Sequence, residues 1–126
     1  EILKNKIPAI LTKALSIKQT PETNLVLANY YYNISFDFSD SARNIKGTKP
    51  VDLKKKNEYT AASKKAMEDC IPFAESAIDL YSKLQTMKES EKEYYKESYT
   101  MLIEIYRRKG DLKKSEEYKA KKNSIQ

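Results

Sequence analysis

Residues 94–122 constrain the fold most, because they predict two helices joined by a tight turn. In the first half, apolar side chains stand three, four and seven residues after the first of them, as on one helix face: Tyr99, Leu102, Ile103 and Tyr106. Gly110 is typical of a helix end, and the basic residues before it suit the negative end of the helix dipole. Asp111 is a suitable N-cap for a second, short helix, on which Tyr118 turns back onto the first. The segment therefore predicts an antiparallel helix hairpin.

The composition of the 126-residue chain favours helices in a single domain. Two Gly and four Pro leave little turn material for a β-sandwich. A hydrophobic fraction of 40% and a charged fraction of 33% indicate amphipathic helices in a folded domain rather than a disordered chain. No apolar run reaches the ~20 residues that a membrane span needs. The sequence therefore predicts an all-α fold over residues 1–126.

Helical periodicity and turn residues divide the chain into about five predicted helices. A short break around Pro21 separates the first two, with Thr20 or Thr23 as the N-cap of the second. Gly47 and Pro50 are stop signals after the second helix, and a polar turn precedes the fourth. The predicted helices cover residues 2–18, 22–45, 51–84, 89–109 and 111–124.

The third predicted helix, residues 51–84, is much longer than an average helix. Its candidate N-cap is Asp52. Pro72 lies inside the helical pattern and removes one backbone hydrogen bond, so we expect a kink or a break near residues 68–70. The residues expected on its buried side are Ala61, Ala62, Ala66, Met67, Cys70, Ile71, Phe73, Ala74, Ala77, Ile78, Tyr81 and Leu84.

The order and spacing of these motifs resemble the tetratricopeptide repeat (TPR) family. Residues 99–106 follow the TPR pattern Trp-x2-Leu-Gly-x2-Tyr, with Tyr99 in place of Trp and Ile103 in place of Gly. Ala28 likewise stands where Gly is common, and Ser115 where Ala is common, which are changes of size at packing positions. Three segments are similar to the C-terminal module of bacterial cell-envelope TPR proteins: LANYYYN at 27–33, CIPFAESAIDLY at 70–81 and MLIEIYRRKGDLKKSEEYKAKK at 101–122.

The resemblance implies a stack of antiparallel helix hairpins with elongated central helices. By this comparison residues 1–18 are the second helix of a truncated preceding repeat, residues 22–84 one elongated repeat, and residues 89–124 the C-terminal repeat. Because the sequence starts without Met, we expect it to be a piece of a longer protein. The family also implies the periplasm or the cell envelope, with the cytoplasm as the alternative.

The resemblance further implies a contact surface, because the first helix of each TPR pair lines the concave side of the stack. The residues that project from these two helices are Asn29, Tyr32, Asn33, Thr100, Glu104, Arg107 and Arg108. Their side chains suit extended peptides and carboxylates, although an ordinary solvated helix face is the alternative. Of three consecutive tyrosines at least one must point away from the core, and we expect it to be Tyr32. Leu25 occupies the place of the lysine in the carboxylate clamp of some chaperone-binding TPRs, which disfavours chaperone tails.

The residue types argue against catalysis. The chain has no His, which removes the usual general base and the commonest metal ligand. Its one cysteine, Cys70, lies among Ala and Ile and is expected to be a small buried hydrophobe. There is no glycine-rich phosphate loop, and acidic pairs such as Glu116 and Glu117 are adjacent in the sequence rather than on one helix face. We therefore expect no enzyme activity, no cofactor and no metal site.

Three functions agree with these observations. The leading hypothesis is a non-catalytic TPR-like scaffold module that binds a protein or peptide partner. The first alternative is a structural capping domain of a longer solenoid, without a ligand of its own. The second alternative, suggested by the net charge of +6 and the lysine-rich residues 107–122, is a module that binds nucleic acid or an anionic surface. The polar outer face that a terminal helix must present explains that charge equally well.

Overall fold

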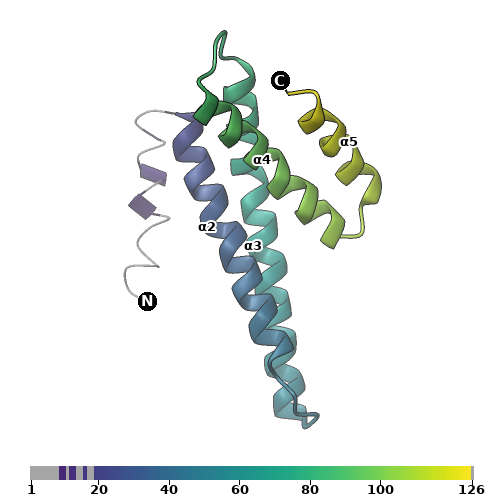
Figure 1. The fold of residues 1–126 in the computed structure, drawn as a ribbon. Helices are drawn as coiled ribbons and strands as arrows, with labels where there is room; N and C mark the ends of the chain where they lie inside the picture. Colours follow the sequence, from purple (N-terminus) through teal and green to yellow (C-terminus); the bar gives the residue numbers. More distant parts are fainter. Residues whose placement is uncertain (1–8, 11, 14–15, 17–18, 126) are drawn as a thin grey trace.

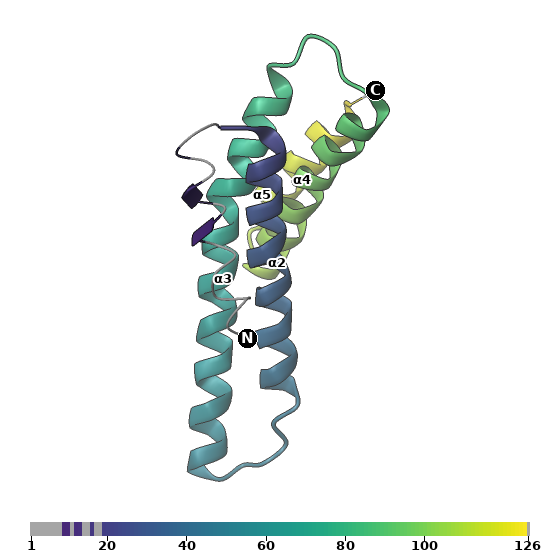
Figure 2. The ribbon, with the colours of Figure 1, turned by 90° about the vertical axis from the view of Figure 1, so that its left-hand side faces the viewer.

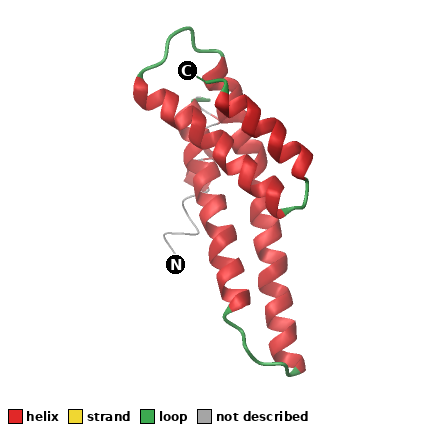
Figure 3. Cartoon of the chain, turned by 45° about the vertical axis from the view of Figure 1, so that its right-hand side comes forward, coloured by secondary structure: helices red, strands yellow, loops and turns green. Residues whose placement is uncertain are grey.

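Helices form nearly all of the part of the chain that is described by the computed structural model, which comprises residues 9–10, 12–13, 16 and 19–125. The helices with defined bounds are α2 (Pro21–Arg43), α3 (Pro50–Ser82), α4 (Glu89–Arg108) and α5 (Leu112–Asn123). No strand occurs in the described residues (Figure 3). None of the described helices combines the length and the apolar character that crossing a membrane requires. The predicted all-α class is confirmed.

The predicted bounds of these four helices agree with the structure to within two residues. The fifth prediction, a helix over residues 2–18, lies mostly outside the described residues. Residues 9–10, 12–13 and 16 of that segment are described and are helical. The count of five helices therefore stays a prediction.

Of the two candidate N-caps of α2, the structure has Thr20, whereas the predicted N-cap of α3 is wrong. Thr20 has an extended backbone, and its hydroxyl accepts a hydrogen bond from the Thr23 N–H at 3.1 Å. In α3 the cap is Lys49 rather than Asp52, because Pro50 already supplies the fixed φ of the first helical turn. Asp52 lies within that turn, where its N–H donates to the Lys49 carbonyl at 2.9 Å.

The long helix α3 continues through Pro72 without interruption, so of the predicted kink or break the break does not occur, and the kink stays a prediction. Pro72 lies on the exposed side of the helix. Because proline has no N–H, the carbonyl of Glu68 receives no helical hydrogen bond from residue 72. This carbonyl lies on the side of the helix that solvent reaches. Two residues expected on the buried side are exposed: Ala61 lies toward the projecting end of α3, and Leu84 lies beyond the end of the helix.

The helices are arranged as two antiparallel hairpins. α2 and α3 form a long hairpin, and the shorter α4–α5 hairpin packs against the half of it that is remote from the α2–α3 loop (Figure 1). α4 contacts both α2 and α3, whereas α5 packs on α4. The other half of the long hairpin projects beyond α4 and α5, as the view in Figure 2 also shows.

The core lies where α2, α3 and α4 meet. On α3 it uses small side chains at successive turns, Cys70, Ala74 and Ala77, which let the neighbouring helices approach closely. α4 is buried on two sides, because it packs against the long hairpin and against α5. Met101 and Ile105 are therefore buried in addition to Tyr99, Leu102 and Tyr106 of the predicted face. Ile103, the fourth residue of that face, is only half-buried.

The α4–α5 turn has the predicted chemistry. Gly110 has a φ of 83°, and the Asp111 N–H donates to the Tyr106 carbonyl at 2.9 Å, as in a Schellman motif. The Asp111 carboxylate accepts from the Lys114 N–H at 3.1 Å and caps α5. Tyr118 then stacks on Tyr106, with 5.7 Å between the ring centroids. The predicted hairpin is confirmed in its turn, its cap and its aromatic contact.

Candidate functional site

The predicted contact residues lie on α2 and on α4, which contact each other. The Asn29 side-chain amide donates to the Glu97 carboxylate at 3.2 Å and so links the two helices. Asn33 is exposed on α2, and Thr100 is exposed on α4, where its hydroxyl donates to the Lys96 carbonyl at 3.0 Å. One end of this surface is therefore held by an interhelical hydrogen bond and offers small polar groups to solvent.

Tyr32 is half-buried, so the prediction that it is the exposed tyrosine is wrong. Its ring meets the Phe36 ring in a T-shaped contact, with 4.7 Å between centroids. Burial raises the pKa of the Tyr32 hydroxyl, and the nearby Glu104 carboxylate raises it further. One neighbour of Tyr32 is Phe36, four residues further along α2, and the other is Glu104 on α4. Tyr32 is thus part of the packing between α2 and the C-terminal end of α4.

A cluster of charged side chains occupies the C-terminal end of α4. Arg107 donates two hydrogen bonds to Glu104, at 2.7 Å and 2.6 Å, and Arg108 lies 3.6 Å from the same carboxylate. The hydrogen bond from Arg107 lowers the pKa of Glu104 below its usual range. The Arg108 guanidinium carbon also lies 4.1 Å from the centroid of the Phe36 ring. The structure therefore brings Tyr32, Glu104, Arg107 and Arg108 together.

Sequence reasoning missed Phe36 and Glu97, which hold this surface together. Phe36 follows Tyr32 by four residues and therefore lies on the same face of α2, a spacing that was available in the sequence. Glu97 had no such signal, because its contact with Asn29 depends on how α4 crosses α2. The face formed by the predicted residues together with these two is called the α2–α4 face below.

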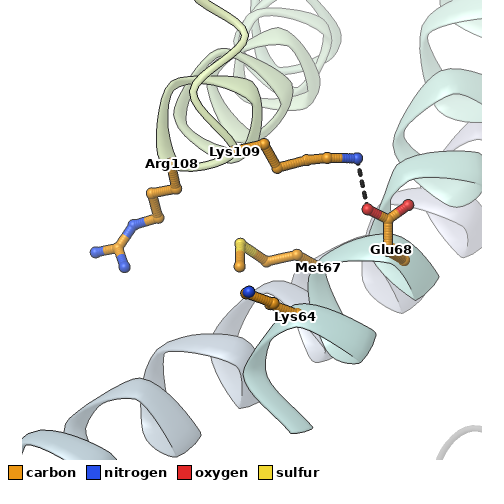
Figure 4. A pocket seen from close by; sticks show the side chains of 5 residues that line it. All are labelled: Lys64, Met67, Glu68, Arg108 and Lys109. Carbon is orange, nitrogen blue, oxygen red and sulfur yellow. Dashed lines mark hydrogen bonds and ion pairs between the residues drawn. The ribbon is translucent and has the colours of Figure 1, made fainter. Parts of the chain in front are cut away.

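Two adjoining cavities of about 340 Å³ and 300 Å³ open where the end of α4 meets the long hairpin. They share Lys64, Met67 and Arg108. In Figure 4 Lys109 extends from the end of α4 to Glu68 on α3, whereas Arg108 points away from Lys109, and Met67 lies between these two side chains and Lys64. The further basic residues that line the pair are Arg43 and Lys56. We call these two cavities the basic groove.

A third cavity of about 290 Å³ lies between α2 and α3 on another side of the long hairpin. Its lining is largely apolar: Tyr30, Tyr31, Ile34, Phe38, Ala62 and Ala66. Ile34 and Phe36 are two residues apart, which places them about 200° apart around α2. This cavity, the aromatic groove, therefore faces away from the α2–α4 face. One wall is fixed by Tyr31, which stacks on Phe73 with 5.8 Å between the ring centroids.

The reactive groups have environments that suit packing. Cys70 is fully buried, and its thiol donates to the Ala28 carbonyl at 3.3 Å. Burial raises the pKa of this thiol to about 12, so little nucleophilic thiolate exists at neutral pH. Within the described residues, no three His, Cys, Asp or Glu side chains gather in a way that would hold a metal ion. Cys70 thus contributes to the hydrophobic core.

Comparisons of this chain with protein-family models, with curated proteins and with solved structures each give no match.

Proposed function

We propose that this chain is a non-catalytic, TPR-like module that binds a protein or peptide partner on its α2–α4 face. The observation that carries the proposal is the pairing of the helices. α2 contacts α3, α3 contacts α4, α4 contacts α5, and α2 also contacts α4. These are the neighbours expected when one helix hairpin stacks on the next and the first helices of both share a face.

The chemistry of the α2–α4 face supports peptide binding. Arg107 and Arg108 are held in place by Glu104 and Phe36, so they lose little side-chain freedom when a partner binds. Asn33 and Thr100 add exposed polar groups on the two helices. A planar guanidinium beside aromatic rings and amide groups is a combination that is frequent at protein interfaces.

The experiment is an affinity capture with the full-length gene product from its native cells. Asn33→Ala, Thr100→Ala and Arg107→Ala each truncate an exposed side chain on the α2–α4 face. Lys119→Ala, on the exposed side of α5, is the matched control. We expect a specific partner to be lost from the three face variants and retained by the control, with unchanged helical circular dichroism. A partner retained equally by all four variants contradicts the proposal.

The second candidate is a structural capping domain of a longer solenoid, and the aromatic groove favours it. Half-buried aromatic and aliphatic side chains surround this cavity on the side remote from the α2–α4 face. Such a surface suits a preceding helix pair of the same protein. In this case Ile34→Asp destabilises the longer chain more than it destabilises the isolated chain, while partner capture through the α2–α4 face is unaffected. Equal losses in both chains argue against the second candidate.

A further inference from the structure

The basic groove gathers cations from three separate helices. Arg43 comes from the end of α2, Lys56 and Lys64 come from α3, and the end of α4 supplies the last two basic residues. Among the residues that line the groove, Glu68 is the single carboxylate. The positive charge here is therefore gathered by the packing of α4 onto the long hairpin. The basic runs at residues 54–56 and 107–109 supply part of it, but only the fold brings them beside Arg43 and Lys64.

Part of this charge is already compensated, and part is not. Lys109 pairs with Glu68 at 2.5 Å, and Arg43 pairs with Asp40 one turn earlier on α2. Arg108 lies 3.6 Å from the Glu104 carboxylate, so its charge is partly compensated as well. Neither Lys56 nor Lys64 forms an ion pair with another described residue. Like charges in one groove repel each other, so a bound anion lowers the electrostatic energy of the site.

The shape of the groove suits an extended chain better than a single ion. Lys56 and Lys64 are eight residues apart on α3, which corresponds to about 12 Å along the helix axis. An extended peptide covers that distance with about four residues. The two adjoining cavities, about 340 Å³ and 300 Å³, each exceed what one small ion fills. Met67 lies between the cations and offers an apolar contact.

We propose that the basic groove binds an extended acidic segment of a partner protein. Carboxylates of the segment pair with Lys56, Lys64 and Arg108, and an apolar side chain between them packs on Met67. This inference rests on the proposed function, because it names the chemistry of the partner and places part of it at the end of the α2–α4 face. Arg108 belongs to both surfaces, so a single partner can cover them together.

A nucleic acid is a poorer match for the same charge. Binding of a single strand relies on aromatic rings that are free to stack on bases. The Phe36 ring already carries the Arg108 guanidinium over its face. The apolar contact at Met67 likewise suits a peptide side chain better than a phosphate backbone.

The test is fluorescence anisotropy of the full chain with three labelled probes. These are a peptide of alternating Glu and Leu, the same peptide with Gln in place of every Glu, and a single-stranded oligothymidylate of equal charge. We expect the Glu peptide to bind more tightly than either of the others. Lys64→Glu and Lys56→Glu each should weaken that binding about tenfold, since a charge pair is replaced by a repulsion. Lys119→Glu, which makes the same change of charge on α5, should leave it unaltered.

Three results overturn the inference. They are equal binding of the Glu and Gln peptides, tighter binding of the oligothymidylate, and equal binding by Lys64→Glu and Lys119→Glu. Because Lys56 and Lys64 are exposed, circular dichroism of their variants should match that of the native chain. Loss of a cellular partner in Asn33→Ala without any binding of the Glu peptide sinks this inference but leaves the proposed function. Conversely, the Glu peptide could bind at the groove while partner capture is insensitive to the face variants. That result contradicts the proposed function and leaves an acidic-peptide site at the groove.

Discussion

The guanidinium of Arg108 lies over the ring of Phe36, with 4.1 Å between the guanidinium carbon and the ring centroid. This contact joins the last residue of α4 to the middle of α2. It also fixes the position of Arg108 at the point where the α2–α4 face meets the basic groove. The orientation of a cation at the proposed binding surface therefore depends on an aromatic side chain of another helix.

A double-mutant cycle with Phe36→Leu and Arg108→Gln measures this contact. At a partly exposed site a cation–π pair contributes about 0.5–1 kcal/mol. The two single variants should therefore lose more free energy of unfolding in sum than the double variant loses, by about that amount. Urea denaturation followed by circular dichroism gives the three values. Losses that simply add would mean that Arg108 gains nothing from the ring.

The buried hydroxyl of Tyr81 predicts a substitution that stabilises the protein. Tyr81 is 0% exposed, and its hydroxyl has no hydrogen-bond partner among the described residues. A buried polar group without a partner costs about 1–3 kcal/mol. Tyr81→Phe should thus raise the free energy of unfolding in urea by about 1 kcal/mol. Tyr118→Phe is the matched control, because the Tyr118 hydroxyl donates to Glu75 at 3.4 Å and should gain nothing. A clear loss of stability in Tyr81→Phe would contradict this account.

The elements of the fold were predictable because their signals are local. Gly110 and Asp111 specify the turn of the second hairpin through backbone conformation and capping, both of which act within a few residues. Apolar periodicity gave the helices for the same reason. Asp52 shows the limit of such signals, because two suitable start residues compete and Pro50 is the better placed.

The binding surface was predictable only in part, because it is made by contacts between distant segments. Resemblance to the TPR pattern placed Arg107 and Arg108 on the surface next to α2, but it did not reveal that Tyr32 packs against Phe36 there. The basic residues at the end of α4 were visible in the sequence, but the groove that they form with α3 was not. Lys64 and Arg108 are far apart in the sequence and meet only because α4 ends against the middle of the long hairpin.

Gly110→Ala tests the turn between α4 and α5. The φ of 83° is costly for any residue with a Cβ, by about 1–2 kcal/mol. A Cβ at this position would have no heavy atom within 4 Å, so the cost comes from the backbone alone. Thermal unfolding should show the loss in Gly110→Ala and a smaller one in Gly110→Asn, because Asn tolerates this conformation better. Equal losses in the two variants would point to a steric cause instead.

Cys70 should be unreactive in the native protein. Its thiol is fully buried, and burial raises its pKa to about 12, so both access and thiolate are lacking at neutral pH. Labelling with a thiol reagent should therefore proceed only through unfolding, and its rate should rise when urea is added below the midpoint. Cys70→Ser provides the background. Rapid labelling in the absence of urea would show that the core around Ala28 opens easily.

The free energy of unfolding at acidic pH should depend on the Glu104–Arg107 pair. The hydrogen bonds from Arg107 lower the pKa of Glu104 in the folded state, so the folded chain binds its proton less readily than the unfolded chain. The resulting stabilisation is present above the unfolded pKa of Glu, about 4.3, and is lost as the pH falls through the lowered value. Carbon NMR of the Glu104 carboxyl should give a titration midpoint below that of an ordinary Glu. In Arg107→Gln the midpoint should rise, though Arg108 still lies 3.6 Å from the carboxylate. A midpoint that is identical in the two proteins would show that Arg107 does not hold Glu104 in solution.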